Sequence, residues 1–576
     1  MATKNKHLVL WLIGFLILIC AVTTASILML VDSGPTLLVN NDSEWLKVRV
    51  SGGIKDAPGT EGLVMDPSDL PPLSSDLAAS IAKRAEDDAV KGLFLEIDQV
   101  GMGWAQVESL RRSIATFSEA GKPCIAWAEF YDTKSYYLAS ACETVAISPE
   151  GLPLVTGMNV NQSYYAGTLE LLGVSANFEH VGDFKSAVEP YERTEPSEAA
   201  QDATNGLLDG LYGHITASMA TSRGIPLEAM LDLIDDPPIT AQNAVDRGLI
   251  DERVYRTDLI DRLDDDGGIT TLQDGDLTPG FGAMRIAVIH ADGPIMPGKG
   301  GADVFGDSVV GSRSLVKIIR DVTEDDAFEA VVLRVNSPGG SGSASDDIWH
   351  ALEALKAKKP LVVSMGDYAA SGGYYISMGA DRVFAEPTTI TGSIGVFGGK
   401  MNMAGLFEKG GVSRFEFSRG ARSDLLSTVE DFDPEDRALF RSFLAQFYET
   451  FITKAAEGRS MDVEAMHAVA QGRVWTGTQA LDHGLVDELG GLDEAVTAAA
   501  TMAGLADKSF ARFPERKDFF EQLMEELGNP GGGDAALALT AIPLPAQTGL
   551  RALYRLDRIL QSGGVAAMLP GELTVD

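Results

Sequence analysis

Cysteine, histidine and basic residues are all scarce in this chain of 576 residues. There are only 3 cysteines and 7 histidines, and 46 Lys and Arg residues stand against 83 Asp and Glu residues, for a net charge of −37. So few cysteines exclude a disulfide-rich scaffold. The negative charge, with no basic tract from Val31 onward, argues against a protein that binds nucleic acid. The length predicts a soluble body of two or three domains.

Two of the cysteines, Cys124 and Cys142, lie in apolar stretches of the sequence. A single pair of cysteines without further ligands is not the signature of a zinc site, which takes four. We therefore expect two separate buried thiols, because free cysteine is among the most buried residue types. The sequence predicts no metal site and no cofactor.

One long uncharged run is present near the N-terminus. Residues Leu8 to Val31 carry no charge and are enough to cross a bilayer as a helix. Lys4 and Lys6 before the run and Asp32 after it predict a cytoplasmic N-terminus and a bulk that faces outward. A cleaved signal peptide is the alternative, although its apolar run would normally be shorter. We expect residues 1–31 to form a cytoplasmic stub and a transmembrane anchor.

The chain repeats itself. Three pairs of segments match in the same order at an offset of about 237 residues, which is the mark of an internal duplication. The matching pairs are Lys91–Gly101 with Glu329–Gly340, Gly121–Pro149 with Lys358–Pro387, and Ile239–Asp251 with Trp475–Asp487. We expect two copies of one domain. The predicted boundaries are 45–260 for the first copy, 261–283 for an acidic Gly-rich linker, 284–505 for the second copy, and 506–576 for an unassigned tail.

Each copy alternates short β-branched runs with helical patterns. In the second copy, Ala330–Val335 reads as a strand, Ser345–Lys356 as a helix and Leu361–Ser364 as another strand. Strands that alternate with helices predict a parallel sheet joined by helical crossovers. The predicted fold class is therefore α/β.

A serine among small residues is the strongest catalytic candidate in the second copy. The stretch "GDYAASGGYYI" places Ser371 directly before paired glycines, and an earlier strand ends in "NSPGG", with Gly339 and Gly340. Glycines allow the backbone to turn sharply and to point its amides at a nearby oxygen. We expect the amides of Gly339, Gly340 and Gly372 to stabilise an oxyanion. Ser393, in "TGSIGV", is a candidate for contact with bound peptide or with the base.

The first copy lacks this serine and keeps a lysine instead. The residue opposite Ser371 is Thr133 or Lys134, depending on one gap, whereas Lys185 in "GDFKSAV" stands where the second copy has Ser423. A serine nucleophile needs a base. Burial can lower the pKa of a lysine from about 10.4 by roughly 3 units or more, which would make it that base. The sequence thus predicts a split active site in which Lys185 deprotonates Ser371.

Taken together, "RVNSPGG", "GDYAASGGYYI", "GDFKSAVEPY" and "TGSIGV" resemble the signal peptide peptidase A (protease IV) family. The similarity is to the long, double-domain form of Gram-negative bacteria and extends to about residue 500. It implies two tandem Clp protease/crotonase-like domains after a transmembrane helix, with Ser371 as nucleophile and Lys185 as general base. It also implies a homo-oligomer, a tetramer, on the periplasmic side of the inner membrane, which degrades cleaved signal peptides and other short apolar peptides.

Several alternatives stay open. A Ser–His site would use a histidine of the second copy, where none lies in a distinctive motif: His290, His350, His467 and His483. A crotonase-like fold could process acyl-CoA thioesters, which an outward-facing chain would rarely meet. A noncatalytic scaffold would be favoured by the loss of Ser371 or Lys185, and both are present. The sequence does not decide whether Lys185 serves Ser371 of its own chain or of a neighbouring chain.

Overall fold

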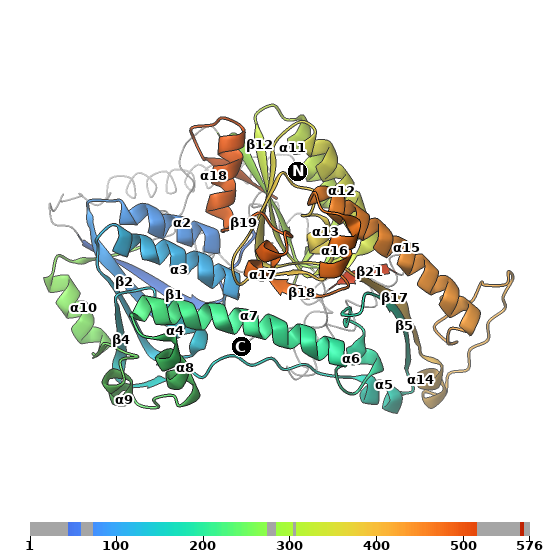
Figure 1. Cartoon of the computed structure of the whole chain (residues 1–576), viewed down its shortest axis with the longest axis horizontal. Helices are drawn as coiled ribbons and strands as arrows, with labels where there is room; N and C mark the ends of the chain where they lie inside the picture. Colours follow the sequence, from blue (N-terminus) through green and yellow to red (C-terminus); the bar gives the residue numbers. More distant parts are fainter. Residues whose placement is uncertain (1–43, 59–72, 273–283, 303–306, 515–564, 569–576) are drawn as a thin grey trace, which may run out of the picture. The chain divides into compact units, whose positions relative to one another are not determined.

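Two β-sheets of mostly parallel strands, one in each copy, organise the part of the chain that the structure describes (Figure 1). The computed structural model describes residues 44–58, 73–272, 284–302, 307–514 and 565–568. The anchor predicted over Leu8–Val31 lies outside these residues. Among the described helices, none combines the length and the apolar character needed to cross a membrane.

The first copy is built on a sheet of six parallel strands. In order across the sheet they are β6 (Glu252–Arg253), β4 (Thr144–Pro153), β3 (Cys124–Tyr131), β2 (Val90–Val100), β1 (Glu44–Gly52) and β7 (Ile269–Thr271). The described helices of this copy are α2 (Ser74–Ala85), α3 (Trp104–Glu119), α4 (Thr133–Ala139), α5 (Ala166–Leu172), α6 (Glu189–Glu192), α7 (Glu198–Arg223), α8 (Leu227–Asp235), α9 (Ala241–Asp246) and α10 (Arg256–Asp265). Strand β2 is buried without a break from residue 92 to 97, as expected for a parallel strand that is covered on both faces.

The second copy repeats this plan. Its strands run in the order β18 (Val474–Thr476), β16 (Ile390–Gly392), β14 (Leu361–Ala370), β12 (Ala330–Ser337), β8 (Ile286–Asp292) and β20 (Phe510–Phe513). Off this path, β15 (Arg382–Ala385) pairs with β14, and β19 (Glu488–Leu489) pairs with β15. Its described helices are α11 (Ser312–Glu324), α12 (Gly342–Lys356), α13 (Gly372–Tyr375), α14 (Ala404–Lys409), α15 (Pro434–Gly458), α16 (Val463–Val469), α17 (Gly477–Asp482) and α18 (Leu492–Met502). All of these pairings are parallel except that of β16 with β18.

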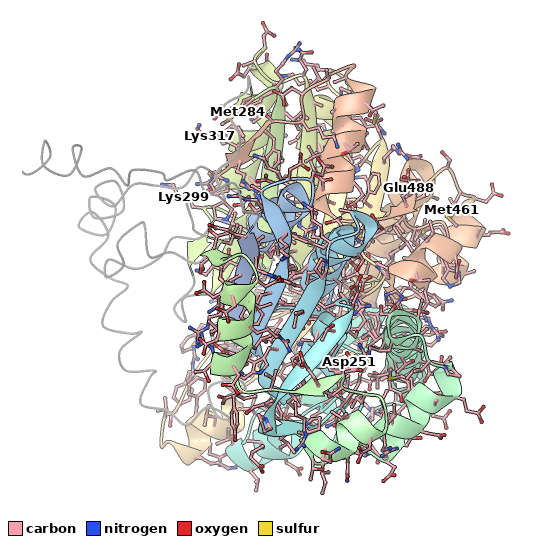
Figure 2. The ribbon with its side chains drawn as sticks, turned by 90° about the vertical axis from the view of Figure 1, so that its left-hand side faces the viewer. Asp251, Met284, Lys299, Lys317, Met461 and Glu488 are labelled. Carbon is pink, nitrogen blue, oxygen red and sulfur yellow. A yellow bond between two sulfur atoms is a disulfide. The ribbon has the colours of Figure 1, made fainter. Side chains whose placement is uncertain are left out.

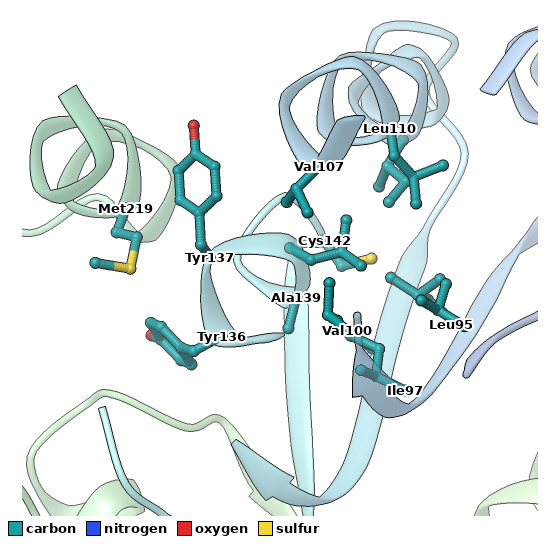
Figure 3. Packing of buried hydrophobic residues seen from close by; sticks show 14 of the residues in the cluster. Leu95, Ile97, Val100, Val107, Leu110, Tyr136, Tyr137, Ala139, Cys142 and Met219 are labelled. Carbon is teal, nitrogen blue, oxygen red and sulfur yellow. The ribbon is translucent and has the colours of Figure 1, made fainter. Parts of the chain in front are cut away.

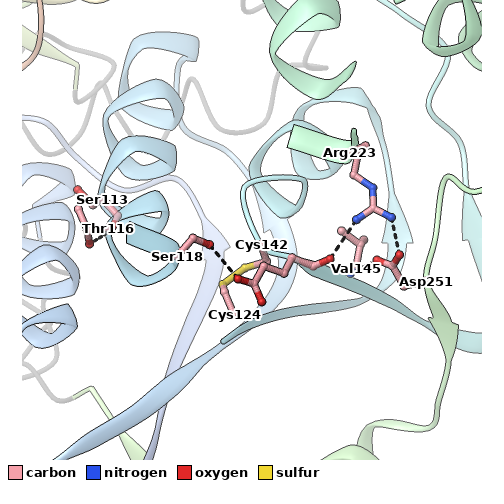
Figure 4. The surroundings of a disulfide bond; sticks show 9 residues. Ser113, Thr116, Ser118, Cys124, Cys142, Val145, Arg223 and Asp251 are labelled. Carbon is pink, nitrogen blue, oxygen red and sulfur yellow. Dashed lines mark hydrogen bonds and ion pairs between the residues drawn. A yellow bond between two sulfur atoms is a disulfide. The ribbon is translucent and has the colours of Figure 1, made fainter. Parts of the chain in front are cut away.

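Equivalent hydrogen bonds confirm the duplication. Arg223 pairs with Asp251 at 2.7 Å in the first copy, and Arg459 pairs with Asp487 at 2.5 Å in the second. In both copies the aspartate also accepts a hydrogen bond from a valine amide at the start of the neighbouring strand. Figure 4 shows Arg223 and Asp251, and Figure 2 labels Asp251 together with Glu488, the residue after Asp487. The α/β class and the tandem arrangement predicted from the sequence are therefore confirmed.

Both copies extend beyond the boundaries expected from the sequence. Helix α10 and strand β7 fall in the stretch expected to be a linker, and β7 pairs with β1, so the first copy continues to Thr271. Strand β20 lies in the expected tail and pairs with β8 of the second copy. Short edge strands of this kind carry too little periodicity to be recognised in a single sequence.

The core of the first copy packs α4 and α7 against the sheet. Figure 3 shows Tyr136 and Tyr137 of α4 close to Met219 of α7, and Leu95 and Ile97 of β2 in the same cluster. The hydroxyl of Tyr136 donates to the carbonyl of Leu249 at 2.7 Å, which satisfies its polar atom inside an apolar core. The buried hydroxyl of Tyr136 fixes the position of α4, which begins at Thr133.

Cys124 and Cys142 form a disulfide bond (Figure 4). Cys124 is the first residue of β3, and Cys142 lies just before β4, the neighbouring parallel strand. Their Cα atoms are 4.8 Å apart, within the usual range for a disulfide. The prediction of two separate thiols is therefore wrong, because adjacent parallel strands bring together residues that are 18 positions apart in sequence.

A third sheet joins the two copies. Its strands run in the order β10 (Gly301–Ala302), β11 (Ser308–Gly311), β9 (Ile295–Met296), β13 (Gly339–Ser341), β21 (Val565–Met568), β17 (Val396–Asn402) and β5 (Ser175–Val181). Strand β5 belongs to the first copy and pairs along all of β17 in the second. This antiparallel pairing delivers the chain that follows β5, which includes Lys185, to the second copy.

Buried polar contacts hold the copies together as well. Arg334 of β12 donates two hydrogen bonds of 2.8 Å to the carboxylate of Asp56 in the first copy. Asp367 of β14 accepts hydrogen bonds from the Ala105 and Gln106 amides at the N-terminus of α3, where a carboxylate satisfies helix amides that lack partners. These contacts restrain the position of one copy relative to the other.

Candidate active site

Ser371 stands at the turn between strand β14 and the short helix α13. Its backbone has φ 54° and ψ −110°, a conformation that costs energy for any residue other than glycine. Its side chain is completely buried, and its amide donates to the carbonyl of Gly392 at 2.8 Å. The small neighbours are required, since a Cβ on Gly373 would lie 2.6 Å from the carbonyl oxygen of Ser337. The turn holds the hydroxyl in one place.

Lys185 reaches this serine from the first copy. Its Nζ donates to Ser371 Oγ at 2.8 Å, and to the carbonyl oxygen and Oγ of Ser393, both at 3.0 Å. Only 1% of the lysine surface is exposed. Burial lowers the pKa of Lys185 well below its usual value of 10.5. The amine therefore lies next to the serine hydroxyl in a setting that favours its neutral, proton-accepting form.

Lys185 and Ser371 meet within a single chain. Lys185 and Ser371 are 186 residues apart in sequence, and each sits in the copy that the sequence comparison assigns it. The structure places the serine of the second copy and the lysine of the first in contact. Ser393, predicted only as a neighbour of peptide or base, contacts the lysine amine directly.

The loop that carries Lys185 is held by a segment of the second copy that the sequence comparison missed. The Phe184 amide donates to the carbonyl of Gln471 at 2.8 Å. A Cβ on Gly472 would lie 2.6 Å from the Cα, Cβ and amide nitrogen of Lys185, and Gly472 has φ +81°. The lysine backbone can approach this closely only because residue 472 is glycine. In the sequence this segment is marked only by the short stretch "QGR", residues 471–473, directly before the repeated segment Trp475–Asp487.

Backbone strain is concentrated at this place. Four residues other than glycine have positive φ in the described part of the chain. Ser371 at 54° and Ser393 at 51° contact the Lys185 amine, and Gln471 at 55° binds the loop that carries Lys185. Each costs on the order of 1–3 kcal/mol and persists only where the surrounding structure enforces it. Strain of this kind typically accompanies groups that are held for chemistry.

The equivalent place in the first copy has no such pair. Because Tyr136 and Tyr374 make equivalent hydrogen bonds to Leu249 and Leu485, Thr133 is the residue that lies opposite Ser371. Its Oγ1 donates to the carbonyl of Gly157 at 2.8 Å and accepts from the amide of Gly157 at 3.0 Å. The threonine hydroxyl is therefore committed to backbone groups and lacks a base.

Alignment of the two copies also set Lys134 opposite Ser371, as an alternative to Thr133, and Ser423 opposite Lys185. Both residues make ordinary contacts. Lys134, the other candidate opposite the nucleophile, places its amine 5.0 Å from the centre of the Trp104 ring. Ser423, which aligns with Lys185, is exposed and donates to the carbonyl of Gly420 at 3.0 Å. The Lys185 amine donates its hydrogen bonds to Ser371 and Ser393, and neither Lys134 nor Ser423 is among these partners.

The glycines predicted to bind an oxyanion lie beside the nucleophile, in two groups. Gly372 is the first residue of α13, directly after Ser371, and helix-initiating amides have no partner within the helix. Gly339 and Gly340 form the start of β13, where the Gly339 amide donates to Ser337 Oγ at 3.2 Å. A Cβ on Gly340 would collide with the backbone of Ile295. Only glycine allows β13 to pass this close to β9.

Three of the four histidines of the second copy are buried or packed against other residues, and His350 is exposed. His290 is buried next to the Asp56–Arg334 pair, and burial lowers its pKa to about 3. His467 Nδ1 lies 2.9 Å from the hydroxyl of Tyr448, and His483 packs on the ring of Trp475. Within the described residues, Lys185 is the basic side chain that contacts Ser371.

Comparison with known proteins gives a consistent picture. The model of peptidase family S49 matches residues 116–270 and 353–506, once in each copy and over more than half of the chain. The chain is 33% identical over 444 residues to "Serine protease SPPA, chloroplastic" of Arabidopsis thaliana, which covers 74% of this chain and 65% of that protein. It is 33% identical over 472 residues to "Protease 4" of Salmonella typhi, 78% of this chain and 75% of that protein. It is 31% identical to "Protease 4" of Haemophilus influenzae, 74% of this chain and 72% of that protein.

Proposed function

Since this chain belongs to peptidase family S49 and is a serine protease, we propose that it hydrolyses peptides with a Ser–Lys dyad. Ser371 is the nucleophile and Lys185 is the general base. The observation that carries the proposal is the buried 2.8 Å hydrogen bond from Lys185 Nζ to Ser371 Oγ. It is supported by the lowered pKa of Lys185 and by the absence of an equivalent pair at Thr133.

The proposed reaction follows from these positions. Ser371 Oγ attacks the carbonyl carbon of the scissile bond while its proton passes to the neutral amine of Lys185. The amides of Gly372, Gly339 and Gly340 stabilise the oxyanion. When the C–N bond breaks, the Lys185 ammonium donates its proton to the leaving amine. Water then attacks the acyl-enzyme with Lys185 again as base, and releases the second product.

Ser393 has a positioning role in this scheme. Its carbonyl oxygen and its hydroxyl both accept hydrogen bonds from Lys185 Nζ. They orient the free amine toward Ser371, and they stabilise the ammonium that forms during the reaction, because hydrogen bonds to a charged donor are stronger than those to a neutral one.

We also infer where the protease works and on what. The uncharged run Leu8–Val31 would anchor the chain in the inner membrane with its N-terminus in the cytoplasm and two Clp protease/crotonase-like copies in the periplasm. Cleaved signal peptides and other short apolar peptides are then the expected substrates. Apolar side chains beside the dyad support this preference: Ala187, Val188, Met296 and Phe397 are all buried in one cluster. By resemblance, the working form is a homo-oligomer, a tetramer.

The dyad is tested with a fluorogenic apolar peptide and three purified variants. Ser371→Ala and Lys185→Ala should each reduce hydrolysis by at least about 10²-fold. The matched control is Thr133→Ala, the equivalent change in the first copy, which should keep wild-type activity. Because both groups lie on one chain, mixing the two inactive variants should not restore activity. Full activity of Lys185→Ala would overturn the dyad.

Membrane attachment and assembly need separate measurements. Protease added to spheroplasts should digest the chain from the outside, and deletion of residues 1–31 should release it from the membrane fraction. Light scattering of the released chain should give a mass of several subunits. Digestion only after lysis would contradict the orientation, and a monomer at all concentrations would contradict the assembly.

A further inference from the structure

We propose that Arg473 is a positioning residue for the reaction: it holds the loop that carries Lys185 against the turn that carries Ser393. The lysine amine thereby stays directed at Ser371. This inference rests on the proposed function, in which Lys185 is the base for Ser371. It begins from the segment Gln471–Arg473, which lies directly before strand β18.

The direction of the Lys185 amine depends on the backbone that carries it. In the described part of the chain, the hydrogen bonds of this amine go to Ser371 and Ser393. No carboxylate is among these partners, so no ion pair fixes the amine in place. Its position is therefore set by the path of the loop before it and by whatever holds that loop.

The backbone of residues 471–473 joins the two parts that surround the amine. On one side, the Phe184 amide donates to the carbonyl of Gln471 at 2.8 Å. On the other side, the Ser393 amide donates to the carbonyl of Arg473 at 2.7 Å. Because these two carbonyls belong to one short segment, a shift of the segment changes the position of the lysine loop relative to the Ser393 turn.

The side chain of Arg473 lies on the residue next to the lysine. Its guanidinium carbon is 4.7 Å from the centre of the Phe184 ring and 4.9 Å from the centre of the Trp475 ring. Aromatic faces attract a guanidinium, and its planar shape suits such contacts. Since Phe184 directly precedes Lys185 in the sequence, contact with its ring restrains the path of the backbone into the lysine.

Helix α7 of the first copy contacts the same guanidinium. Arg473 donates to the carboxylate of Asp202 at 2.8 Å. A Cβ on Gly206, one turn after Asp202 on α7, would lie 3.2 Å from the guanidinium, so this small residue leaves room for the arginine. The carbonyl of Gly206 accepts a hydrogen bond of 3.0 Å from Gln479, and Figure 1 shows α7 beside β18. Arg473 thus contacts two separate parts of the first copy, α7 and the lysine loop.

The ring contact, rather than the ion pair, carries the positioning. The Asp202 side chain is 61% exposed, and an ion pair at such an exposed place contributes little. The Arg473 side chain is only 23% exposed, and its contact with Phe184 acts on the residue next to the lysine. The two contributions can therefore be separated by substitution.

The first test compares kcat and KM with a fluorogenic apolar peptide. Arg473→Met keeps an unbranched side chain but removes the guanidinium. It should lower kcat about 10- to 10²-fold, because a misplacement of about 1 Å can cost that much. KM should stay within about threefold of wild type, since the groups that bind the peptide are unchanged. Asp202→Asn, which removes only the ion pair, should keep the wild-type kcat. A wild-type kcat in Arg473→Met would overturn the proposal.

The matched control is Arg437→Met. Arg437 also joins the copies, since it pairs with Glu179 of β5 and its guanidinium lies 5.9 Å from the centre of the Phe432 ring. These partners belong neither to the Lys185 loop nor to the Ser393 turn, so this variant should keep the wild-type kcat. An equal loss of kcat in Arg437→Met and Arg473→Met would refute a specific role of Arg473.

A double variant tests the contact itself. Phe184→Leu should lower kcat, and the double variant with Arg473→Met should be no slower than the slower single variant, because both changes remove one contact. Losses that multiply would show that the two residues act independently, and would refute the ring contact as the cause.

The last test needs no peptide hydrolysis. A fluorophosphonate probe labels the Ser371 hydroxyl with release of fluoride, and the rate is followed against pH in wild type, Arg473→Met and Lys185→Ala. The rate in Arg473→Met should rise at a higher pH than in wild type, because a displaced amine that meets water regains a pKa nearer its usual 10.5. A loss of folded protein alone would leave this pH profile unchanged and would refute positioning.

The same labelling separates this inference from the proposed function. If Lys185→Ala is labelled as fast as wild type, the proposed dyad fails, and the role of Arg473 fails with it. If Lys185→Ala is labelled slowly while Arg473→Met keeps the wild-type rate and pH profile, the dyad stands and the role of Arg473 alone is refuted.

Discussion

Replacement of Lys185 by methionine is the most informative single perturbation of this chain. Methionine keeps an unbranched apolar side chain in the same space but removes the amine. Hydrolysis should fall by about 10²–10⁴-fold, the usual contribution of a general base. The fold should survive, because Lys185 is buried to 99% and has no carboxylate partner that the change would leave unpaired.

The same change has a predictable effect on stability. The folded state holds Lys185 with a pKa below 10.5, the value of a free lysine, so it gives up a proton that the unfolded chain keeps. Each unit of lowering costs the folded state about 1.4 kcal/mol when the pH is below both pKa values. Methionine escapes this cost and loses three hydrogen bonds worth about 1 kcal/mol each. We expect the variant to be at least as stable as wild type at pH 7.

The stability difference between wild type and Lys185→Met should depend on pH, in a direction set by the lowered pKa of Lys185. Between the lowered pKa of Lys185 and 10.5 the unfolded chain binds more protons than the folded chain, so wild-type stability should rise with pH by up to about 1.4 kcal/mol per unit relative to the variant. Urea unfolding of both proteins at pH 7 and pH 9, followed by circular dichroism, measures this difference. Peptide hydrolysis is assayed in parallel.

A matched control distinguishes loss of the Lys185 amine from the loss of any buried lysine. Lys400 on β17 is also a buried lysine, with its Nζ 4.7 Å from the centre of the Phe432 ring. Lys400→Met should keep hydrolysis within a few-fold of wild type. The reasoning would be refuted if Lys185→Met kept more than a tenth of wild-type activity, or if its stability followed pH in parallel with wild type.

Three further predictions address the same chemistry and the contact between the copies. Gly472→Ala should reduce kcat by about 10²-fold with little loss of fold, because its Cβ would displace Lys185 by pressing on its backbone; wild-type kcat would contradict this. In wild type, kcat/KM should rise as Lys185 loses its proton and level off well below pH 10.5; a rise centred on 10.5 would mean that the base is a solvated lysine. Arg334→Leu should lower the free energy of unfolding in urea by about 3–5 kcal/mol, because it leaves Asp56 buried without its partner. The double variant with Asp56→Asn should recover much of that loss, and no recovery would refute the pairing as the cause.

Local sequence patterns were enough to predict the α/β fold of each copy and the two central candidate residues of the site. The offset between the matching segments predicted two copies, and the β-branched runs predicted the parallel strands, because both features are written in neighbouring residues. Comparison of the copies singled out Ser371 and Lys185. Each is present in one copy only, so the fold that both copies share does not require it. The short strands β7, β20 and β21 were not predicted, because a few residues without periodicity give no signal.

What the sequence determined by itself is thus the repeated α/β domain, and it singled out Ser371 and Lys185 as the candidate nucleophile and base. The tertiary structure alone decided which groups meet. It set Thr133, not Lys134, opposite the nucleophile, brought Gly472 against the lysine, and joined Cys124 to Cys142. It also paired residues 565–568 with β13 and β17. The reason is physical: strand pairing and packing act between residues that are tens to hundreds of positions apart, and periodicity in one sequence records only what each residue does with its near neighbours.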